Sequence, residues 1–352
     1  MKKIVFNGQF LARRMTGQER FAYETIVELD KLVGKEKIEL VIPPNAHNIP
    51  RLQNIKIVET GRLKGIIWEQ ISFGLYTLRN KALSLNLCSV MPIIKPGIIC
   101  IHDLSYKVNP QYCKNLYGKL SQIWHKIFYH LAWKFSPIIY TVSNYSKQQM
   151  IDIYGVKSEK VHVIENGWQH FKTVTEDDGI FQKKTRLKKN EYFFMLGSLS
   201  PNKNLEWIYG VAEKNPNEIF AVAGNIVSYG DSYKDRNLQN VELLGFVSDE
   251  EVKALMKNCK AFIFPSKFEG FGIPPLEALS VGAKIIVSNA SCLPEIYGNA
   301  AVYINPYDTD VDLNELLSKT TTGEKEVLEK YSFKHSAEKI YADLCELGYD
   351  LS

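Results

Sequence analysis

One stretch sets the fold class of this chain: Phe264-Pro265-Ser266-Lys267-Phe268-Glu269-Gly270-Phe271-Gly272-Ile273-Pro274-Pro275-Leu276-Glu277-Ala278. An apolar run typical of a buried strand, 261–264, leads into it, and a run typical of a helix, 276–281, leads out. The Gly-Phe-Gly between them predicts a loop at the carboxyl end of a strand. Open α/β sheets bind ligands there, and helix N-termini favour anions. The carboxylates of Glu269 and Glu277 therefore indicate a ligand with hydroxyls near a phosphate.

Strand-like apolar runs alternate with helix-like stretches along the whole chain. The predicted strands are 4–6, 40–42, 98–101, 138–142 and 161–164, and then 192–196, 219–223, 241–244, 261–264, 284–287 and 301–304. This alternation predicts βαβ units with parallel sheets. The pattern restarts after residue 190, so we expect two α/β domains, the usual number for 352 residues.

The expected domains are 1–170 (N-terminal) and 191–331 (C-terminal), joined by a polar linker at 171–190. Residues 332–352 are typical of a helix capped at Ser332. Periodicity does not say on which domain this terminal helix packs; our prediction is that it crosses back to the N-terminal domain.

The location of the protein is also constrained by the sequence. No apolar run approaches the roughly 20 residues that span a bilayer, and the first residues predict a buried strand, not a signal peptide. The six cysteines show no C-x-x-C spacing, which is typical of a reducing, cytoplasmic location. A metal site built from these cysteines is not expected.

The net charge of +4 is unevenly distributed. Residues 1–170 contain 23 Lys+Arg and 12 Asp+Glu (+11), whereas residues 171–352 contain 20 and 27 (−7). A basic half implies an anionic partner: nucleic acid, a membrane surface or a phosphorylated substrate. The basic residues are scattered and match no nucleic-acid-binding module. The aromatic, lysine-containing stretch 116–135 fits an interfacial helix at an anionic membrane, although an aromatic stripe is more often core.

A second loop opens the C-terminal half, Met195-Leu196-Gly197-Ser198-Leu199-Ser200-Pro201-Asn202-Lys203-Asn204-Leu205. A strand, a small-residue loop with Lys203 and a helix would make a phosphate cradle. The Walker spacing is missing, and a βα turn with a surface lysine is the plainer alternative. The Asp-x-Asp sequences within 308–312 precede a helix-like run, so helix capping explains them better than a metal site.

Six motifs in order resemble those of family-4 glycosyltransferases of the GT-B type, over nearly the whole chain. They are Ile101-His102-Asp103-Leu104, the set 142–147 with 154–156 and 163–167, then 196–204, 244–247, the stretch from Pro265, and Ser291-Cys292-Leu293-Pro294-Glu295. The resemblance implies two Rossmann-like domains with parallel sheets facing a central cleft. It further implies a retaining, metal-independent enzyme without a cofactor.

The activity implied by this resemblance is transfer of a hexose of mannose, rhamnose or glucose type from a nucleotide-sugar donor. We expect the acceptor to be a lipid-linked glycan that is used in the assembly of a surface polysaccharide, O-antigen or capsule. The enzyme would be cytoplasmic or peripheral at the inner face of the cell membrane, with no nucleic-acid partner.

The resemblance also implies roles for individual residues. Lys203 would hold the donor diphosphate, Glu269 would face the donor sugar, and His102 would complete the catalytic set. Glu277 would bind the nucleotide ribose. The other donor-binding positions would be Gly17, Ser198, Asn202, Phe246, Val247, Phe271, Gly272 and Ile273, with Arg20 and Asp103 on the acceptor side.

Asn202 departs from the family pattern, which commonly has Arg beside the Lys. A neutral amide then replaces a bidentate guanidinium. Either a nearby cation such as Arg186 or Lys234 substitutes, or Lys203 holds the diphosphate alone.

Several alternatives stay open at this point. An epimerase or phosphorylase of the same fold is the nearest alternative enzyme, and a basic membrane- or nucleic-acid-binding protein without transferase activity is a different class. His102 could simply bond to backbone at a strand end, and the stretch 16–21 could be an exposed helix start. The sequence does not identify the donor base, the sugar, the acceptor hydroxyl or the oligomeric state.

Overall fold

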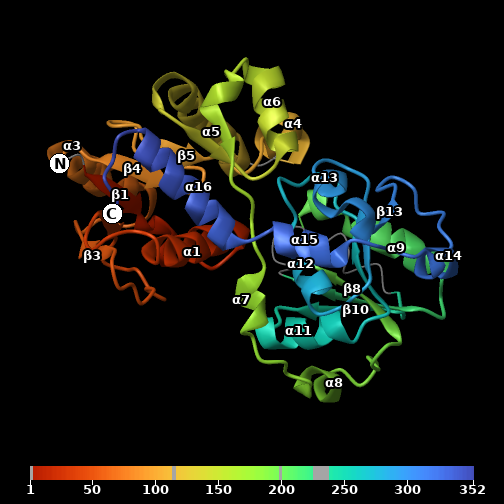
Figure 1. Ribbon diagram of the computed structural model, residues 1–352. Coiled ribbons are helices and arrows are strands. Elements are labelled where there is room, and N and C mark those ends of the chain that lie inside the picture. Colours follow the sequence, from red (N-terminus) through yellow and green to blue (C-terminus); the bar gives the residue numbers. More distant parts are fainter. Residues whose placement is uncertain (1–2, 113–115, 198–199, 225–237) are drawn as a thin grey trace. The chain divides into compact units, whose positions relative to one another are not determined.

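The computed structural model describes residues 3–112, 116–197, 200–224 and 238–352 (Figure 1). The chain divides into two compact units: unit 1 is Met1–Gly167 with Ser332–Ser352, and unit 2 is Trp168–Tyr331. Residues 171–190, expected as a linker, lie within unit 2. There the Lys253 ammonium donates to the carbonyls of Phe171 (3.0 Å) and Val174 (2.7 Å).

Unit 1 is built on a seven-stranded parallel sheet with the order β3-β2-β1-β4-β5-β6-β7. Its strands are β1 (Ile4–Asn7), β2 (Ile38–Ile42), β3 (Lys56–Glu59), β4 (Leu83–Asn86), β5 (Ile98–Cys100), β6 (Ile139–Thr141) and β7 (Val161–Val163). Its helices are α1 (Gly17–Asp30), α2 (Gly65–Ile67), α3 (Gly74–Arg79), α4 (Ser105–Val108), α5 (Leu116–Phe135), α6 (Asn144–Tyr154) and α16 (Phe333–Glu346). Shorter elements are the 3₁₀ turns η1 (Gly8–Ala12), η3 (Pro110–Tyr112) and η4 (Ser158–Lys160), and the π-helix η2 (Trp68–Phe73).

Unit 2 has a six-stranded parallel sheet with the order β10-β9-β8-β11-β12-β13. Its strands are β8 (Tyr192–Leu196), β9 (Ile219–Ala223), β10 (Val241–Gly245), β11 (Ala261–Phe264), β12 (Ile285–Ser288) and β13 (Val302–Ile304). Its helical elements are α7 (Gln169–Lys172), α8 (Gly179–Lys183), η5 (Pro201–Lys203), α9 (Leu205–Lys214), α11 (Asp249–Lys257), α12 (Ile273–Ser280), α13 (Leu293–Tyr297), η6 (Gly298–Ala300), α14 (Leu313–Ser318) and α15 (Glu324–Lys330). The expectation of two Rossmann-like domains with parallel sheets is confirmed.

In both sheets the strand order reverses once, between β1 and β4 in unit 1 and between β8 and β11 in unit 2. Loops that follow the two strands at such a reversal diverge, and they leave a crevice at the carboxyl edge of the sheet. Every predicted strand is present, because central parallel strands are buried on both faces and are continuously apolar.

The sequence pattern missed β3 and β4. β3 is an exposed edge strand. β4 alternates apolar and polar residues, and its buried polar side chains bond to one another: Asn86 Nδ2 donates to Ser84 Oγ (3.0 Å), and Asn7 Nδ2 donates to Asn86 Oδ1 (3.1 Å).

The terminal helix α16 packs along α1, as Figure 1 shows, and the Phe21 and Phe333 rings lie 6.4 Å apart. Ser332 caps this helix, accepting from the Lys334 N–H at 3.1 Å. In the part of the chain that the structure describes, no helix is both long and apolar enough to cross a bilayer.

Candidate functional site

Lys203 and Glu269, from loops after the two strands at the reversal in unit 2, are in direct contact. Lys203 ends η5, which follows β8, and Glu269 follows β11. Lys203 Nζ lies 2.7 Å from Glu269 Oε1, and the two side chains are only 18% and 11% exposed. The Lys203 stem passes over Gly197, where a Cβ would be 3.5 Å away, and its ammonium lies 5.1 Å from the centre of the Phe264 ring. The fold therefore brings together two of the three predicted catalytic residues.

Asn202 joins the two loops. Its carbonyl accepts from the Lys267 N–H (2.7 Å), and its side-chain amide donates to the Phe268 carbonyl (3.3 Å). The neighbouring Asn204, at φ +62°, donates to the carbonyls of Pro265 (3.0 Å) and Pro306 (2.7 Å). The amide at position 202 thus positions the loop that carries Glu269.

Arg186 does not replace the missing arginine of the family pattern. Its guanidinium pairs with Glu242 at 3.5 Å, near the start of β10 and so at the amino edge of the sheet. Lys203 lies at the opposite, carboxyl edge. The other candidate cation, Lys234, and the predicted donor-binding Ser198 lie outside the described residues.

The backbone from Glu269 to Gly272 is held by side chains from the start of α13. Ser291 Oγ accepts from the Glu269 N–H (3.0 Å), and Cys292 Sγ donates to the carbonyls of Glu269 and Phe271 (both 3.4 Å). The Tyr297 hydroxyl donates to the Gly272 carbonyl. Burial raises the pKa of both Cys292 and Tyr297, which keeps these donors protonated. Sequence reasoning did not assign this clamp.

Gly272 is the residue before α12, at φ +89°, and a Cβ there would lie 2.8 Å from Leu293 Cδ2. Phe271 is buried against Tyr331 in an edge-to-face contact, with ring centres 5.2 Å apart. Ile273 opens α12, three residues earlier than the predicted start of this helix at Leu276. The predicted donor-binding positions 271–273 therefore form one rigid turn into a helix N-terminus.

Glu277 has a different partner, which the sequence did not suggest. Its Oε1 accepts from His170 Nε2 at 2.8 Å, and the side chains of Glu277 and His170 are 13% and 5% exposed. His170 lies on α7, at the start of unit 2. Only the folded chain brings α7 against α12, so the pair has no sequence signal.

Three adjacent strands of unit 2 end at or just before a glycine, so the carboxyl edge of the sheet carries no side chain at these three positions. Gly197 follows β8, Gly224 follows β9, and Gly245 ends β10. The Gly224 N–H donates to the Gly245 carbonyl (2.7 Å), and a Cβ on Gly224 would lie 1.7 Å from the Gly197 oxygen. Phe246 and Val247 follow at this edge, the first 72% exposed and the second buried.

His102, the third predicted catalytic residue, belongs to unit 1 and follows β5. Its Nε2 lies 2.8 Å from the Leu87 carbonyl, which can only accept, so Nε2 carries the proton. Burial lowers the pKa of His102, although the Leu87 bond and the charge of Glu19 oppose the shift. The ring is therefore neutral and Nδ1 is an acceptor. The backbone bond considered as the plain alternative is present, and it fixes the tautomer.

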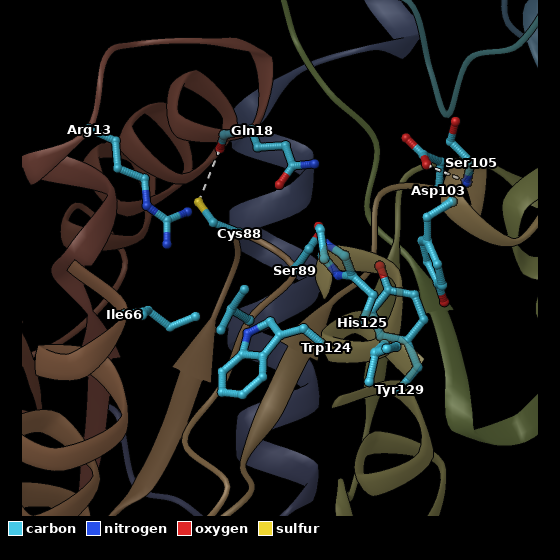
Figure 2. Close-up of a pocket in the computed structure, with 14 residues that line it drawn as sticks. Arg13, Gln18, Ile66, Cys88, Ser89, Asp103, Ser105, Trp124, His125 and Tyr129 are labelled. Atoms are coloured by element: carbon cyan, nitrogen blue, oxygen red, sulfur yellow. Dashed lines mark hydrogen bonds between the residues drawn. The ribbon is translucent and has the colours of Figure 1, made fainter. Parts of the chain in front are cut away.

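The predicted acceptor-side residues lie around the same edge of unit 1. Asp103 Oδ1 accepts from the Ser105 N–H at 2.7 Å. Arg20 is half-buried in the first turn of α1, and Gly17, a predicted donor-binding residue, is the first residue of that helix. Asp103 also lines a cavity of about 1000 Å³, and every described residue of its lining belongs to unit 1 (Figure 2). Its lining is Arg13, Gln18, Ile66, Cys88, Ser89, Val90, Asp103, Ser105, Tyr106, Ser121, Ile123, Trp124, His125 and Tyr129.

The Asp-x-Asp stretch is explained by local bonds. Asp308 accepts from the Asp310 N–H (2.8 Å), and Asp312 caps α14 by accepting from the N–H groups of Asn314 and Glu315. Within the described residues, no three His, Cys, Asp or Glu side chains gather as metal ligands. What unit 2 offers chemically is a cation and a carboxylate at a glycine-rich edge, an arrangement suited to a ligand with separated negative and positive charge.

The comparisons with known proteins agree with this geometry. Residues 176–333 match the model of the family described as glycosyl transferases group 1. The O-antigen chain mannosyltransferase RfbU of Salmonella typhimurium is 29% identical over 262 residues, which are 71% of this chain and 69% of that protein. The O-antigen chain mannosyltransferase B of Escherichia coli is 24% identical over 341 residues, 88% of each chain.

Two further matches differ in extent. The chain spans only 28% of the serotype-specific mannosyltransferase WbdA of Escherichia coli, at 28% identity over 60% of its own length. The solved structure of Anabaena Alr3699/HepE in complex with UDP and glucose has the same fold, with a TM-score of 0.69, 15% identity and coverage of 98% of this chain and 100% of that chain. The resemblance stated from the motifs is confirmed: residues 176–333 are similar to the group 1 glycosyl transferases, and most of the chain is similar to O-antigen mannosyltransferases.

Proposed function

We propose that this glycosyltransferase moves a hexose of the mannose type from a nucleotide-sugar to a lipid-linked glycan during assembly of a surface polysaccharide such as O-antigen. We further propose that it retains the anomeric configuration and needs no metal ion. The relatives named above as O-antigen mannosyltransferases support the sugar and the pathway class. The observation that carries the proposal is the 2.7 Å contact between Lys203 and Glu269.

The two charges of this pair suit the two halves of a nucleotide-sugar. As the bond between the anomeric carbon and the phosphate oxygen breaks, negative charge grows on the diphosphate and positive charge grows on the sugar ring. Lys203 stabilises the first and Glu269 the second, and such preorganised charges are usually the largest catalytic contribution. The donor enters by separating the pair, so each residue exchanges one charged partner for another.

Retention follows when the acceptor hydroxyl attacks from the face that the phosphate leaves. Its proton passes to the departing phosphate oxygen, so no protein nucleophile is needed. With Asn202 bonded to the Glu269 loop, Lys203 holds the diphosphate without a neighbouring arginine. Glu277, oriented by His170, accepts hydrogen bonds from the ribose, and His102 Nδ1 accepts one from a sugar hydroxyl.

We also propose that unit 1 docks peripherally on an anionic membrane at the inner face of the cell. Among the described residues, every exposed large hydrophobic side chain except Phe246 and Tyr307 belongs to unit 1. Residues 70–151 contain nine Lys+Arg and a single acid, Asp103. On α5, the rings of Phe128 and Tyr129 are core, whereas Ile127 (43%) and Phe135 (53%) are exposed, with Lys126 and Lys134 next to them in the sequence. Such a face fits an anionic lipid surface.

Thermal shift with GDP, UDP and dTDP tests the donor site first. A ligand at 100 times its dissociation constant stabilises the folded state by about 2.7 kcal/mol. Transferase activity is then measured with sugar nucleotides that carry the stabilising base and with an alkyl-linked acceptor, in the presence of a chelator. Proton NMR of the product should show the donor's anomeric configuration. No response to any diphosphate would refute the donor site, and loss of activity in chelator or an inverted product would refute metal independence or retention.

A further inference from the structure

The cavity of unit 1 is built at the carboxyl edge of its sheet, beside the reversal between β1 and β4. Cys88 and Ser89 enter it from the segment after β4, and Arg13 and Gln18 from the segment after β1 (Figure 2). Its volume of about 1000 Å³ is large enough for one or two sugar rings.

One side of the cavity is aromatic. Tyr106 stacks on His125 with ring centres 5.0 Å apart, and Trp124 packs edge-to-face on Phe128 at 4.7 Å. Trp124 Nε1 and His125 Nδ1 are buried and have no hydrogen-bond partner in the part of the chain that is described. Burial lowers the pKa of His125, so this ring adds no charge. The wall thus offers apolar faces with unused hydrogen-bonding capacity.

The described lining also includes one positively and one negatively charged side chain, so its formal charge is zero. Of the described lining residues, Arg13 is the one with a permanent positive charge. Its guanidinium lies 3.7 Å from Glu19 Oε1 and 3.6 Å from Glu69 Oε2. Asp103 lines the cavity as well. Glu19 and Glu69 are not among the described lining residues, so they pair with Arg13 from outside the cavity.

This balance of charge differs from that of the surrounding chain, which is basic. Between residues 70 and 151 the one acid, Asp103, lines the cavity, and none of the nine Lys+Arg is among its described lining residues. Arg13 is already neutralised by two carboxylates, so a ligand anion placed here would lose water without gaining a new cation.

An uncharged sugar has the chemistry that this cavity fits. Its C–H faces pack on aromatic rings, and its hydroxyls donate to carboxylates, bonds that are stronger than those between neutral groups. We propose that the cavity binds the uncharged terminal sugar of the acceptor and discriminates against sugars that carry a carboxylate or phosphate. The proposal rests on the glycosyltransferase function proposed above and specifies its acceptor; any phosphate of a lipid carrier then lies outside the cavity.

Binding of two matched glycosides to the full-length protein tests this inference. p-Nitrophenyl β-glucoside and p-nitrophenyl β-glucuronide differ only in a carboxylate at C6, and their dissociation constants can be compared by saturation-transfer NMR titration at constant ionic strength. We expect the glucoside to bind at least tenfold more tightly. The double substitution Glu19→Gln with Asp103→Asn should reduce this ratio, because it removes one carboxylate partner of Arg13 and the negative charge of the lining.

Trp124→Ala should weaken glucoside binding at least fivefold, whereas Ile153→Ala, an exposed position on α6 outside the lining, should leave it unchanged. Glucuronide binding as tight as glucoside binding, or no binding of either, would overturn the inference, as would wild-type glucoside affinity in Trp124→Ala. Thermal shift by nucleoside diphosphates, which depends on Lys203 in unit 2, is measured on the same samples. If nucleoside diphosphates still stabilise the protein but the glycoside test fails, only the inference about the acceptor is wrong. If nucleoside diphosphates do not stabilise the protein, the proposed function itself is wrong.

Discussion

The two units present the same edge of the same fold in opposite ways. In unit 2 the loops at the strand reversal are held by side-chain bonds to backbone, and glycines stand at the ends of three strands. In unit 1 the corresponding edge opens into a cavity with an aromatic wall. By sequence, unit 1 has 25 Lys+Arg and 16 Asp+Glu, and unit 2 has 18 and 23.

We infer from this difference that the donor chemistry shared by the family constrains unit 2 more than unit 1. The family model matches residues 176–333, which lie almost wholly in unit 2. A diphosphate requires fixed charges at fixed places, whereas a glycan acceptor requires a shape and an aromatic surface that vary with the sugar. The predictions below test whether function divides between the units in this way.

The largest expected effect is on the ion pair of unit 2. Lys203→Ala and Glu269→Ala should each lower kcat at least 100-fold, since removing one preorganised charge-stabilising group costs about 2.7–4 kcal/mol in the transition state. Steady-state kinetics with circular dichroism checks this, and Lys214→Ala, an exposed lysine on α9, is the control. Wild-type turnover in either variant would show that the active site in unit 2 is wrongly assigned.

The glycines at the carboxyl edge of the unit 2 sheet should tolerate substitution less well than the rest of that unit. Gly224→Ala places a Cβ 1.7 Å from the Gly197 oxygen, so the ends of β8 and β9 must separate. We expect a loss of about 3 kcal/mol or more in the free energy of unfolding, from overpacking together with a positive φ. Gly245→Ala has a positive φ but open space around the new Cβ, and should lose only about 1 kcal/mol. Equal losses in urea denaturation would show that the edge is not close-packed.

Membrane binding should depend on lysines of unit 1 and not on those of unit 2. Lys126→Gln with Lys134→Gln should weaken binding to anionic vesicles about 30-fold, since each lysine near such a surface contributes about 1 kcal/mol. The matched control is Lys188→Gln with Lys325→Gln in unit 2, whose side chains are 72% and 85% exposed. Vesicle co-sedimentation gives the ratio, and an equal loss in both pairs would mean that only net charge matters.

The smallest effect concerns the buried histidine of unit 1. Because burial lowers the pKa of His102 below its ordinary 6.5, the unfolded chain takes up this proton at a higher pH than the folded chain. Stability is therefore lost as pH falls below 6.5, by at most about 1.4 kcal/mol at one unit lower. His102→Gln should remove this part of the change in unfolding free energy between pH 7.5 and pH 5.5, whereas His47→Gln, at an exposed site, should not. Equal pH dependence in wild type and His102→Gln would show that the ring is not held neutral.

Much of the site in unit 2 was predictable, because its residues sit next to strand and helix signals. The apolar run 261–264 and the glycines after it placed Glu269 at a strand end, and Lys203 followed from the same logic at 192–196. The family resemblance then supplied their roles. The sequence could not show that the Asn202 side-chain amide donates to the Phe268 carbonyl, because that bond joins residues 66 positions apart.

By itself, the sequence determined the parallel α/β class, nearly all the strands, the caps at Ser332 and Asp312 and the resemblance to family-4 glycosyltransferases, since these depend on local periodicity and short motifs. Only the tertiary structure decided the strand order, the return of α16 to α1, the His170–Glu277 pair and the placement of Arg13 between Glu19 and Glu69. Those features are contacts between residues distant in the chain, and no local pattern encodes which buried charge meets which partner. The acceptor cavity, assembled from segments between residues 13 and 129, is the clearest case.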